Sequence, residues 1–167
     1  DYTYDVERFQ KIFHKMKQCG CHFVVASGNQ YYQLRDLFSG YYDELSFVAE
    51  NGAFVKDQRQ LVFTADIPRE TVDLVIDVCR EYPEISNVVC GLNSAYCERG
   101  SVDQDFFDLT NIYYHRLQWV DDFKEIKDQI LKFAPTVPIE KTYDYYDIFR
   151  ERLAGKIDPT TSGHGSI

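Results

Sequence analysis

Residues 23–30 read FVVASGNQ, and this stretch decides how the first half of the chain is interpreted. Four apolar residues run directly into a small hydroxyl side chain, a glycine and two amides. A short apolar run between helical patterns is typical of a parallel strand that is buried on both faces. The polar residues after it form either a turn in which Ser27 caps the next helix or a loop that binds an anion. Local sequence leaves both interpretations open.

The segments around this stretch alternate between helical and strand patterns. Residues 5–18 carry apolar side chains at helical spacing, and Gly20 is expected to end that helix. A second amphipathic helix is predicted over residues 30–41, and strand patterns follow it up to residue 65, where the tip of a hairpin is expected at residues 56–60. This order indicates a doubly wound α/β sheet, which binds ligands beyond the carboxyl ends of its strands. The inward positions expected on the first helix are Val6, Phe9, Ile12, Phe13 and Met16.

The second half of the chain has a different order of elements. Residues 69–83 predict a helix between two prolines, and residues 86–99 predict two short strands around Gly91-Leu92-Asn93. Residues 121–135 predict a third helix or a helix–strand pair that ends at Pro135. Further helices are expected within residues 103–120 and 139–155, and a strand and turn over 156–167. We therefore expect two domains, residues 1–65 and residues 66–167, and the second is an α+β module.

Composition limits the classes of partner. The 167 residues carry a formal net charge of −9, which argues against binding to nucleic acid or to an anionic membrane. No apolar run is long enough to span a membrane and no signal peptide is visible, so we expect a cytoplasmic protein. The acidic surface gives no reason to expect an oligomer, so a monomer is predicted. Five cysteines without a framework spacing indicate reduced thiols, and Cys19, Cys21 and His22 are interpreted as a helix-to-strand turn rather than a metal site.

Four motifs in order carry a resemblance to a known family. They are FVVASGNQYYQL, then SFVAENGAFV, then CGLNSAY inside the long insert, and finally TTSGHGSI. As an ordered set they resemble the Cof-type, subclass IIB branch of the haloacid dehalogenase (HAD) superfamily, and especially its sugar-phosphate phosphatases. The resemblance implies a partial Rossmann-like core, a parallel sheet with a β-hairpin, over residues 1–65. It also implies a type-IIB (C2) α+β cap over residues 66–167.

The resemblance also implies roles for particular residues. Ser27 matches the family's second motif, so Ser27, Gly28 and Asn29 are expected to bind the phosphoryl group, and Ser27 is the catalytic candidate. Asn51 and Gly52 match a turn that the family places near its site. From the residues themselves, Asn93, Ser94 and Tyr96 offer the amide and hydroxyl groups that bind sugars, although a plain strand-to-strand turn explains them equally well.

Three motifs of the family are not found in this sequence. No Asp-x-Asp-Gly-Thr run occurs, and Asp103-Gln104-Asp105 has no strand before it. The resemblance implies that the nucleophilic aspartate, the lysine and the Mg²⁺ ligands lie outside this stretch of 167 residues, so no metal ligand is assigned to this chain. The segment looks like a piece of a longer protein.

The function implied for the whole protein is hydrolysis of a phosphomonoester by a Mg²⁺-dependent phosphatase. The expected substrate is a small phosphorylated molecule such as a sugar phosphate, and the reaction passes through an aspartyl-phosphate. Phosphomutase activity is a second possibility within the family. A different class remains open if the chain is complete as shown: a non-catalytic module that binds a phosphorylated ligand or takes part in an interaction.

Overall fold

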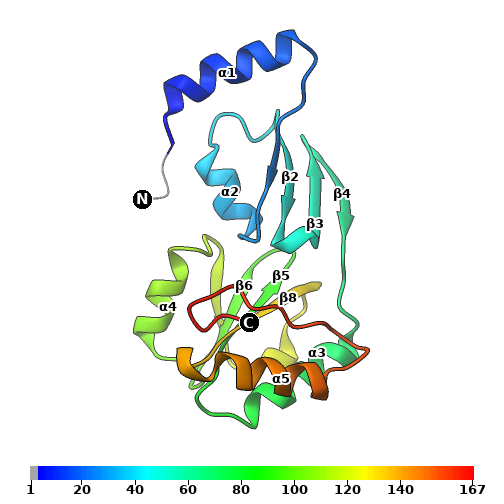
Figure 1. Cartoon of the computed structure of the whole chain (residues 1–167), viewed down its shortest axis with the longest axis vertical. Coiled ribbons are helices and arrows are strands. Elements are labelled where there is room, and N and C mark those ends of the chain that lie inside the picture. The colour runs from blue at the N-terminus through cyan, green and yellow to red at the C-terminus, as the bar shows by residue number, and fades with distance from the viewer. Residues whose placement is uncertain (1–3) are drawn as a thin grey trace. The chain divides into compact units, whose positions relative to one another are not determined.

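The computed structural model describes residues 4–167, and their contacts divide the chain into two units. The first unit takes in residues up to 65 together with 113–115, and the second takes in 66–112 and 116–167. Each unit contains a mixed four-stranded sheet, so the chain has a mixed α/β fold (Figure 1). Within the described part, no helix is both long enough and apolar enough to cross a membrane.

The sheet of the first unit has the strand order β1-β2-β3-β4. Strands β1 and β2 are parallel, and β2, β3 and β4 pair antiparallel in sequence. Gln58 and Arg59 form the two-residue turn of the β3–β4 hairpin, which confirms the predicted hairpin tip. The elements are α1 (Val6–Gln18), β1 (Val24–Ala26), α2 (Tyr31–Leu37), β2 (Ser46–Ala49), η1 (Glu50–Gly52), β3 (Phe54–Asp57) and β4 (Gln60–Thr64).

Helix α1 begins and ends where the sequence predicts. The Asp5 carboxylate accepts a hydrogen bond from the Arg8 backbone N–H at 2.9 Å and so caps the helix. Gly20 adopts a left-handed conformation with φ of 71°, which ends the helix. Of the five side chains expected to face inward, Phe13 is buried, whereas Val6 and Ile12 are each 48% exposed. The inward face of α1 is therefore narrower than the sequence pattern indicates.

Strand β1 differs from its prediction. It lies at one end of the sheet order, and its single neighbour among the described strands is β2. Val24 is 51% exposed, and Ala26 is exposed as well. The prediction of a strand buried on both faces is therefore wrong for the residues described, because nothing in them covers the outer side of β1.

The sheet of the second unit has the strand order β7-β6-β5-β8. Strand β5 pairs antiparallel with β6 and with β8, and β6 pairs parallel with β7. The elements are α3 (Arg69–Arg80), β5 (Ser86–Gly91), β6 (Ala95–Glu98), α4 (Gln104–Asn111), β7 (Leu117–Val120), η2 (Phe123–Glu125), β8 (Ile130–Thr136), η3 (Ile139–Lys141) and α5 (Thr142–Arg152).

Two helices, α3 and α5, lie together over the sheet of the second unit (Figure 1). Residues of α3 pack against Val89 of β5 in one apolar cluster and against Tyr145 and Phe149 of α5 in another. All four side chains predicted to face inward from α3 are buried, which confirms that pattern: Val72, Val75, Ile76 and Cys79.

The region after β7 differs most from the sequence prediction. Residues 121–135 contain the short 3₁₀ turn η2 and the strand β8, so the prediction of a single third helix is wrong, and the alternative of a helix–strand pair is confirmed in part, with a 3₁₀ turn in place of the helix. Pro135 lies inside β8 rather than after it, which is possible because β8 is an edge strand that need not use every backbone N–H. The strand expected within residues 156–167 is replaced by two isolated bridges, Thr136 with Ser166 and Gly163 with Ser166.

Candidate functional site

Ser27 lies in the loop after β1, and its backbone is fixed by a hydrogen bond to β2. The Ser27 N–H donates to the carbonyl of Val48 on β2 at 2.9 Å, which continues the parallel pairing. The Ser27 Oγ accepts a hydrogen bond from the Asn29 backbone N–H at 3.2 Å. Helix α2 begins at Tyr31, and its N-cap residue, Gln30, makes no capping hydrogen bond with its side chain. Ser27 therefore does not cap α2, and its hydroxyl closes a local turn instead.

Gly28 lies directly against the side chain of Asn51. A Cβ atom at position 28 would lie 2.3 Å from the Asn51 Oδ1, which is far inside contact distance. Glycine therefore lets the two loops approach each other without moving the Asn51 side chain. A backbone hydrogen bond also joins the two loops: the Glu50 N–H donates to the Asn29 carbonyl at 3.1 Å.

The turn η1 has an unusual backbone. Glu50, Asn51 and Gly52 have φ angles of 51°, 56° and 92°, so three successive residues are left-handed. Asparagine and glycine tolerate this conformation, whereas it strains a glutamate. Glu50 is also only 2% exposed. This left-handed turn therefore packs directly against the loop that contains Gly28.

The structure thus brings the predicted residues of the first unit together. Ser27, Gly28 and Asn29 form one loop, and Asn51 and Gly52 form the turn that packs against it. The Asn29 side chain is directed to α2, where its Nδ2 donates to the Gln33 Oε1 at 2.6 Å. The loop therefore offers an anion the Ser27 hydroxyl and backbone N–H groups, rather than the Asn29 amide.

In the second unit the predicted polar residues surround a carboxylate that the sequence analysis missed. Asp128 Oδ2 accepts hydrogen bonds from the Asn93 N–H at 2.8 Å, the Ser94 N–H at 3.3 Å and the Tyr96 hydroxyl at 2.9 Å. Its Oδ1 accepts from the Asn93 side-chain amide and the Gln129 N–H, each at 2.9 Å. The β5–β6 turn is therefore organised around Asp128.

This arrangement uses most of the polar groups of the turn internally. Ser94 is 1% exposed, and its hydroxyl donates to the Arg116 carbonyl at 3.2 Å. A Cβ at Gly91 would lie 2.3 Å from Asp128 Oδ2, so this glycine makes room for the carboxylate. Asp128 has no distinctive sequence spacing, and the pairing of β5 with β8, continued by the hydrogen bond from the Leu92 N–H to the Gln129 carbonyl at 2.9 Å, brings it to the turn.

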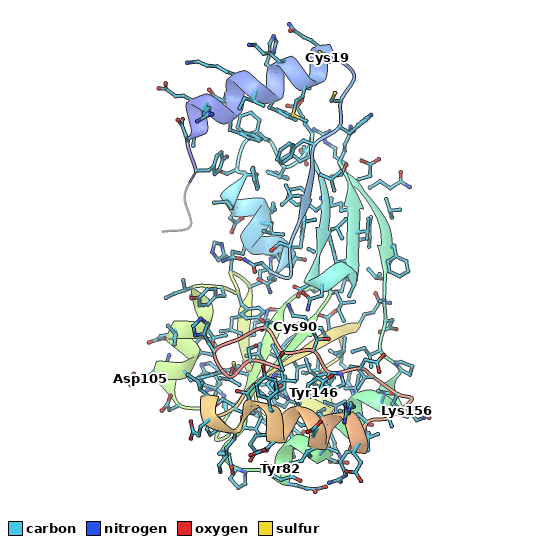
Figure 2. The ribbon with its side chains drawn as sticks, viewed as in Figure 1. Cys19, Tyr82, Cys90, Asp105, Tyr146 and Lys156 are labelled. Atoms are coloured by element: carbon cyan, nitrogen blue, oxygen red, sulfur yellow. The ribbon has the colours of Figure 1, made fainter. Side chains whose placement is uncertain are left out.

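Metal-ligating groups do not gather in the part of the chain that the structure describes. Among residues 4–167, no three or more His, Cys, Asp or Glu side chains are close enough together to hold a metal ion. Cys19, at the end of α1 in Figure 2, and Cys21 are both exposed free thiols. Asp103 caps α4 by accepting from the Phe106 N–H at 2.8 Å, and Asp105 lies in the first turn of that helix (Figure 2). This Asp-x-Asp pair therefore starts a helix.

Comparison with known proteins identifies the family. The sequence model of the haloacid dehalogenase-like hydrolases matches residues 2–167. The chain belongs to this family, which confirms the resemblance found in the sequence.

Individual relatives agree with this assignment. The chain is 35% identical over 165 residues to the Escherichia coli (strain K12) 5-amino-6-(5-phospho-D-ribitylamino)uracil phosphatase YbjI, covering 99% of this chain and 60% of that protein. The crystal structure of SMU.1108c from Streptococcus mutans UA159 matches with a TM-score of 0.91 at 28% identity, covering 99% of this chain and 62% of the other. The HAD subclass IIB sugar phosphatase BT4131 shares the fold at 12% identity, with a TM-score of 0.63 over 87% of this chain and 54% of the other. The chain thus spans about 60% of the length of the curated relative that it matches.

Proposed function

We propose that the full-length protein hydrolyses a phosphomonoester, and that the loop Ser27–Asn29 binds the phosphoryl group being transferred. The observation that carries this proposal is the packing of the Ser27 loop against the left-handed turn at Asn51, beyond the carboxyl ends of two parallel strands. This is the position where α/β sheets bind their ligands. In the proposed role, the Ser27 hydroxyl and the N–H groups of Gly28 and Asn29 stabilise negative charge on the phosphoryl oxygens.

The weak hydrogen bond inside the loop fits this role. The Asn29 N–H reaches the Ser27 Oγ at 3.2 Å, at the long end of the range for such bonds. A phosphate oxygen is a stronger, charged acceptor, so it would displace the hydroxyl from this N–H. The Asn29 N–H would then donate to the anion, and the Ser27 hydroxyl, which only accepts in the present bond, can donate its own proton to the same anion. Asn51 and Gly52 would hold the loop in place from the other side.

For residues 66–167 we propose the role of a C2-type cap domain, and for residues 1–65 the role of part of a Rossmann-like core. In this proposal the turn of Asn93, Ser94 and Tyr96 reads the leaving group of the substrate. Asp128 fixes the shape of the turn. The groups that would contact the leaving group of the substrate are therefore those at the outer edge of the turn and the Asn93 side chain. The buried Ser94 would act by holding the strand that carries Arg116.

Mg²⁺ is part of this proposal only because membership of the family implies it. The residues of this chain that the structure describes do not assemble a metal site, so no step is assigned to a metal. We propose that the attacking aspartate and the Mg²⁺ ligands belong to the part of the relatives' length that this chain does not span. A phosphatase relative supports a small phosphorylated substrate, and the sugar phosphates favoured by the sequence remain the first class to test.

The proposal is tested with a panel of phosphomonoesters, full-length protein and Mg²⁺, in which the release of phosphate is measured. Ser27→Ala is expected to lower kcat/KM by about 10²–10³-fold, because it removes a donor to the developing charge. Ser39→Ala, a change at a serine just after α2, is the matched control and is expected to leave kcat/KM unchanged.

Three outcomes contradict the proposal. An unchanged kcat/KM in Ser27→Ala removes this residue from the site. Binding of phosphate esters without any turnover by the full-length wild-type protein favours the alternative of a non-catalytic phospho-ligand module. Transfer of the phosphoryl group to a second sugar position, rather than to water, identifies a phosphomutase.

A further inference from the structure

Gln33 is an unusual residue on the buried side of α2. This helix buries three side chains, Tyr31, Gln33 and Leu34, and Gln33 is the one among them that ends in an amide. It is only 6% exposed. Folded proteins keep a buried amide where hydrogen bonds satisfy it, since an unsatisfied one destabilises the fold. The hydrogen bond that Gln33 makes with the preceding loop therefore indicates its role.

The Gln33 side chain reaches back to the loop that is proposed to bind phosphate. Its Oε1 accepts a hydrogen bond from the Asn29 Nδ2 at 2.6 Å. Gln33 is the third residue of α2, a position from which a glutamine side chain commonly reaches back to the start of its helix. Here the bond joins the last residue of the loop Ser27–Asn29 to a helix whose buried side packs in the first unit.

Asn29 is held at two points. Its carbonyl accepts from the Glu50 N–H at 3.1 Å, and its side chain donates to Gln33. Its own N–H makes the long bond of 3.2 Å to the Ser27 Oγ, which would break when an anion binds. The residue before it is Gly28, which lacks a Cβ atom, so the peptide that carries this N–H meets little resistance to rotation. The direction of the Asn29 N–H therefore depends on the two fixed points, and Gln33 supplies one of them.

We propose that Gln33 is a positioning residue, which holds Asn29 so that the Asn29 N–H points at the phosphoryl group. This inference rests on the phosphate-binding role proposed for the loop. A neutral amide suits the task, because a carboxylate at the same place would repel a bound phosphate. Gln33 touches neither the substrate nor the reacting atoms and acts through Asn29. A misplacement of about 1 Å can cost about 10²-fold in rate, so one buried hydrogen bond can matter to the site.

The test measures the Kd of tungstate, a phosphate mimic, for the full-length protein by isothermal titration calorimetry. Gln33→Leu keeps most of the volume of the side chain and removes the acceptor, and it is expected to raise the Kd by about tenfold. Gln10→Leu makes the same change at an exposed position of α1 and is the matched control, expected to bind tungstate like the wild type. A merely structural role of Gln33 would lower the free energy of unfolding and leave the Kd of the folded protein unchanged.

Two further variants make the test specific to the bond between the amides. Asn29→Ala removes the donor and is expected to raise the Kd as Gln33→Leu does, so either of the two that folds is informative. Asn29→Gln combined with Gln33→Asn moves one methylene group from one side chain to the other and so keeps the length of the bridge. This swapped pair is expected to restore a Kd close to that of the wild type.

The outcomes separate this inference from the function on which it rests. Gln33 is not a positioning residue if a folded Gln33→Leu or Asn29→Ala variant binds tungstate like the wild type while Ser27→Ala binds it more weakly, and the proposed role of Ser27 then stands. The inference is also overturned if the swapped pair folds but binds as weakly as Gln33→Leu. An unchanged Kd in Ser27→Ala, or no tungstate binding by the wild type, overturns both the inference and the phosphate-binding role of the loop.

Discussion

The loop at Ser27 and the turn at Asn93 carry the same sequence signal but differ in how their polar groups are used. Each has a glycine and small polar residues at the end of a strand: Ser27-Gly28-Asn29 follow β1, and Gly91, the last residue of β5, comes shortly before Asn93 and Ser94. In the first unit the Ser27 Oγ accepts one long hydrogen bond, from Asn29. In the second unit one carboxylate, Asp128, accepts five hydrogen bonds from the turn and the residue beside it.

The two loops thus differ in how strongly their side chains are bonded within the protein: the Ser27 hydroxyl accepts one long hydrogen bond, whereas the groups of the Asn93 turn are bonded to Asp128. A polar group already bonded to a carboxylate loses that bond before it can bind a substrate, whereas a weakly bonded hydroxyl loses little. The Ser27 loop is therefore the stronger candidate for phosphate binding. The Asn93 turn is a rigid surface whose shape depends on Asp128.

The largest expected effect on stability is that of Asp128→Ala. The substitution leaves five donors without their acceptor, and we expect a loss of about 2 kcal/mol in the free energy of unfolding, because water replaces only part of these bonds. Denaturant unfolding of the full-length protein measures this loss. Asp121→Asn, on a side chain that is 87% exposed, is the matched control and should leave the stability unchanged.

Asp128→Ala also tests the proposed function of the turn. If the Asn93 turn reads the leaving group, KM for a sugar phosphate should rise while kcat for a minimal phosphomonoester changes little. A variant with wild-type stability and wild-type KM would show that the five hydrogen bonds do not organise this turn.

A smaller effect is expected for Gly28→Ala in the first unit. The new methyl group would meet the Asn51 Oδ1 at 2.3 Å, so the Asn51 side chain must move, at a cost of about 1 kcal/mol. Because the clash is with a side-chain atom, Asn51→Ala should relieve it. A double-mutant cycle of unfolding free energies is therefore expected to show coupling between positions 28 and 51. Strictly additive effects would mean that the two loops do not touch.

The smallest expected effect is a pH dependence confined to the second unit. A hydrogen bond from the Tyr145 hydroxyl and another from the Lys141 ammonium, at 3.0 Å, lower the pKa of Glu84 from 4.5 to about 2. A lowered pKa in the folded state adds stability that is fully present above pH 4.5 and is lost as the pH falls towards 2. Glu84→Gln should therefore flatten the dependence of stability on pH across this window, and Tyr145→Phe should flatten it in part. Parallel curves for the wild type and Glu84→Gln would contradict the assignment.

Much of the fold could be predicted from the sequence where local patterns were strong. The capped helix α1, the hairpin β3–β4 and the buried face of α3 follow from residue spacing and turn residues alone. Predictions were wrong where the outcome depends on distant partners. Val24 is exposed because β2 is the single described strand beside β1. The structure of residues 121–135 depends on the pairing of β8 with β5, which lies far away in the sequence.

Some residues of the candidate site could likewise be predicted from the sequence, and others could not. Ser27, Gly28 and Asn51 could be found because each stands at the end of a strand within a recognisable motif. Asp128 could not, because an isolated aspartate before a strand carries no local signal. Its place in the turn comes from long-range contacts. The cytoplasmic location, the monomeric state and the absence of nucleic-acid and membrane partners stay predictions.

A crystal structure of the full-length protein with tungstate, a phosphate mimic, tests the central claim most directly. The account predicts that the anion is held by the Ser27 hydroxyl and the N–H groups of Gly28 and Asn29, and that the Asn29 N–H has left the Ser27 Oγ. An anion bound elsewhere, with Ser27 and Asn29 still bonded to each other, would contradict it.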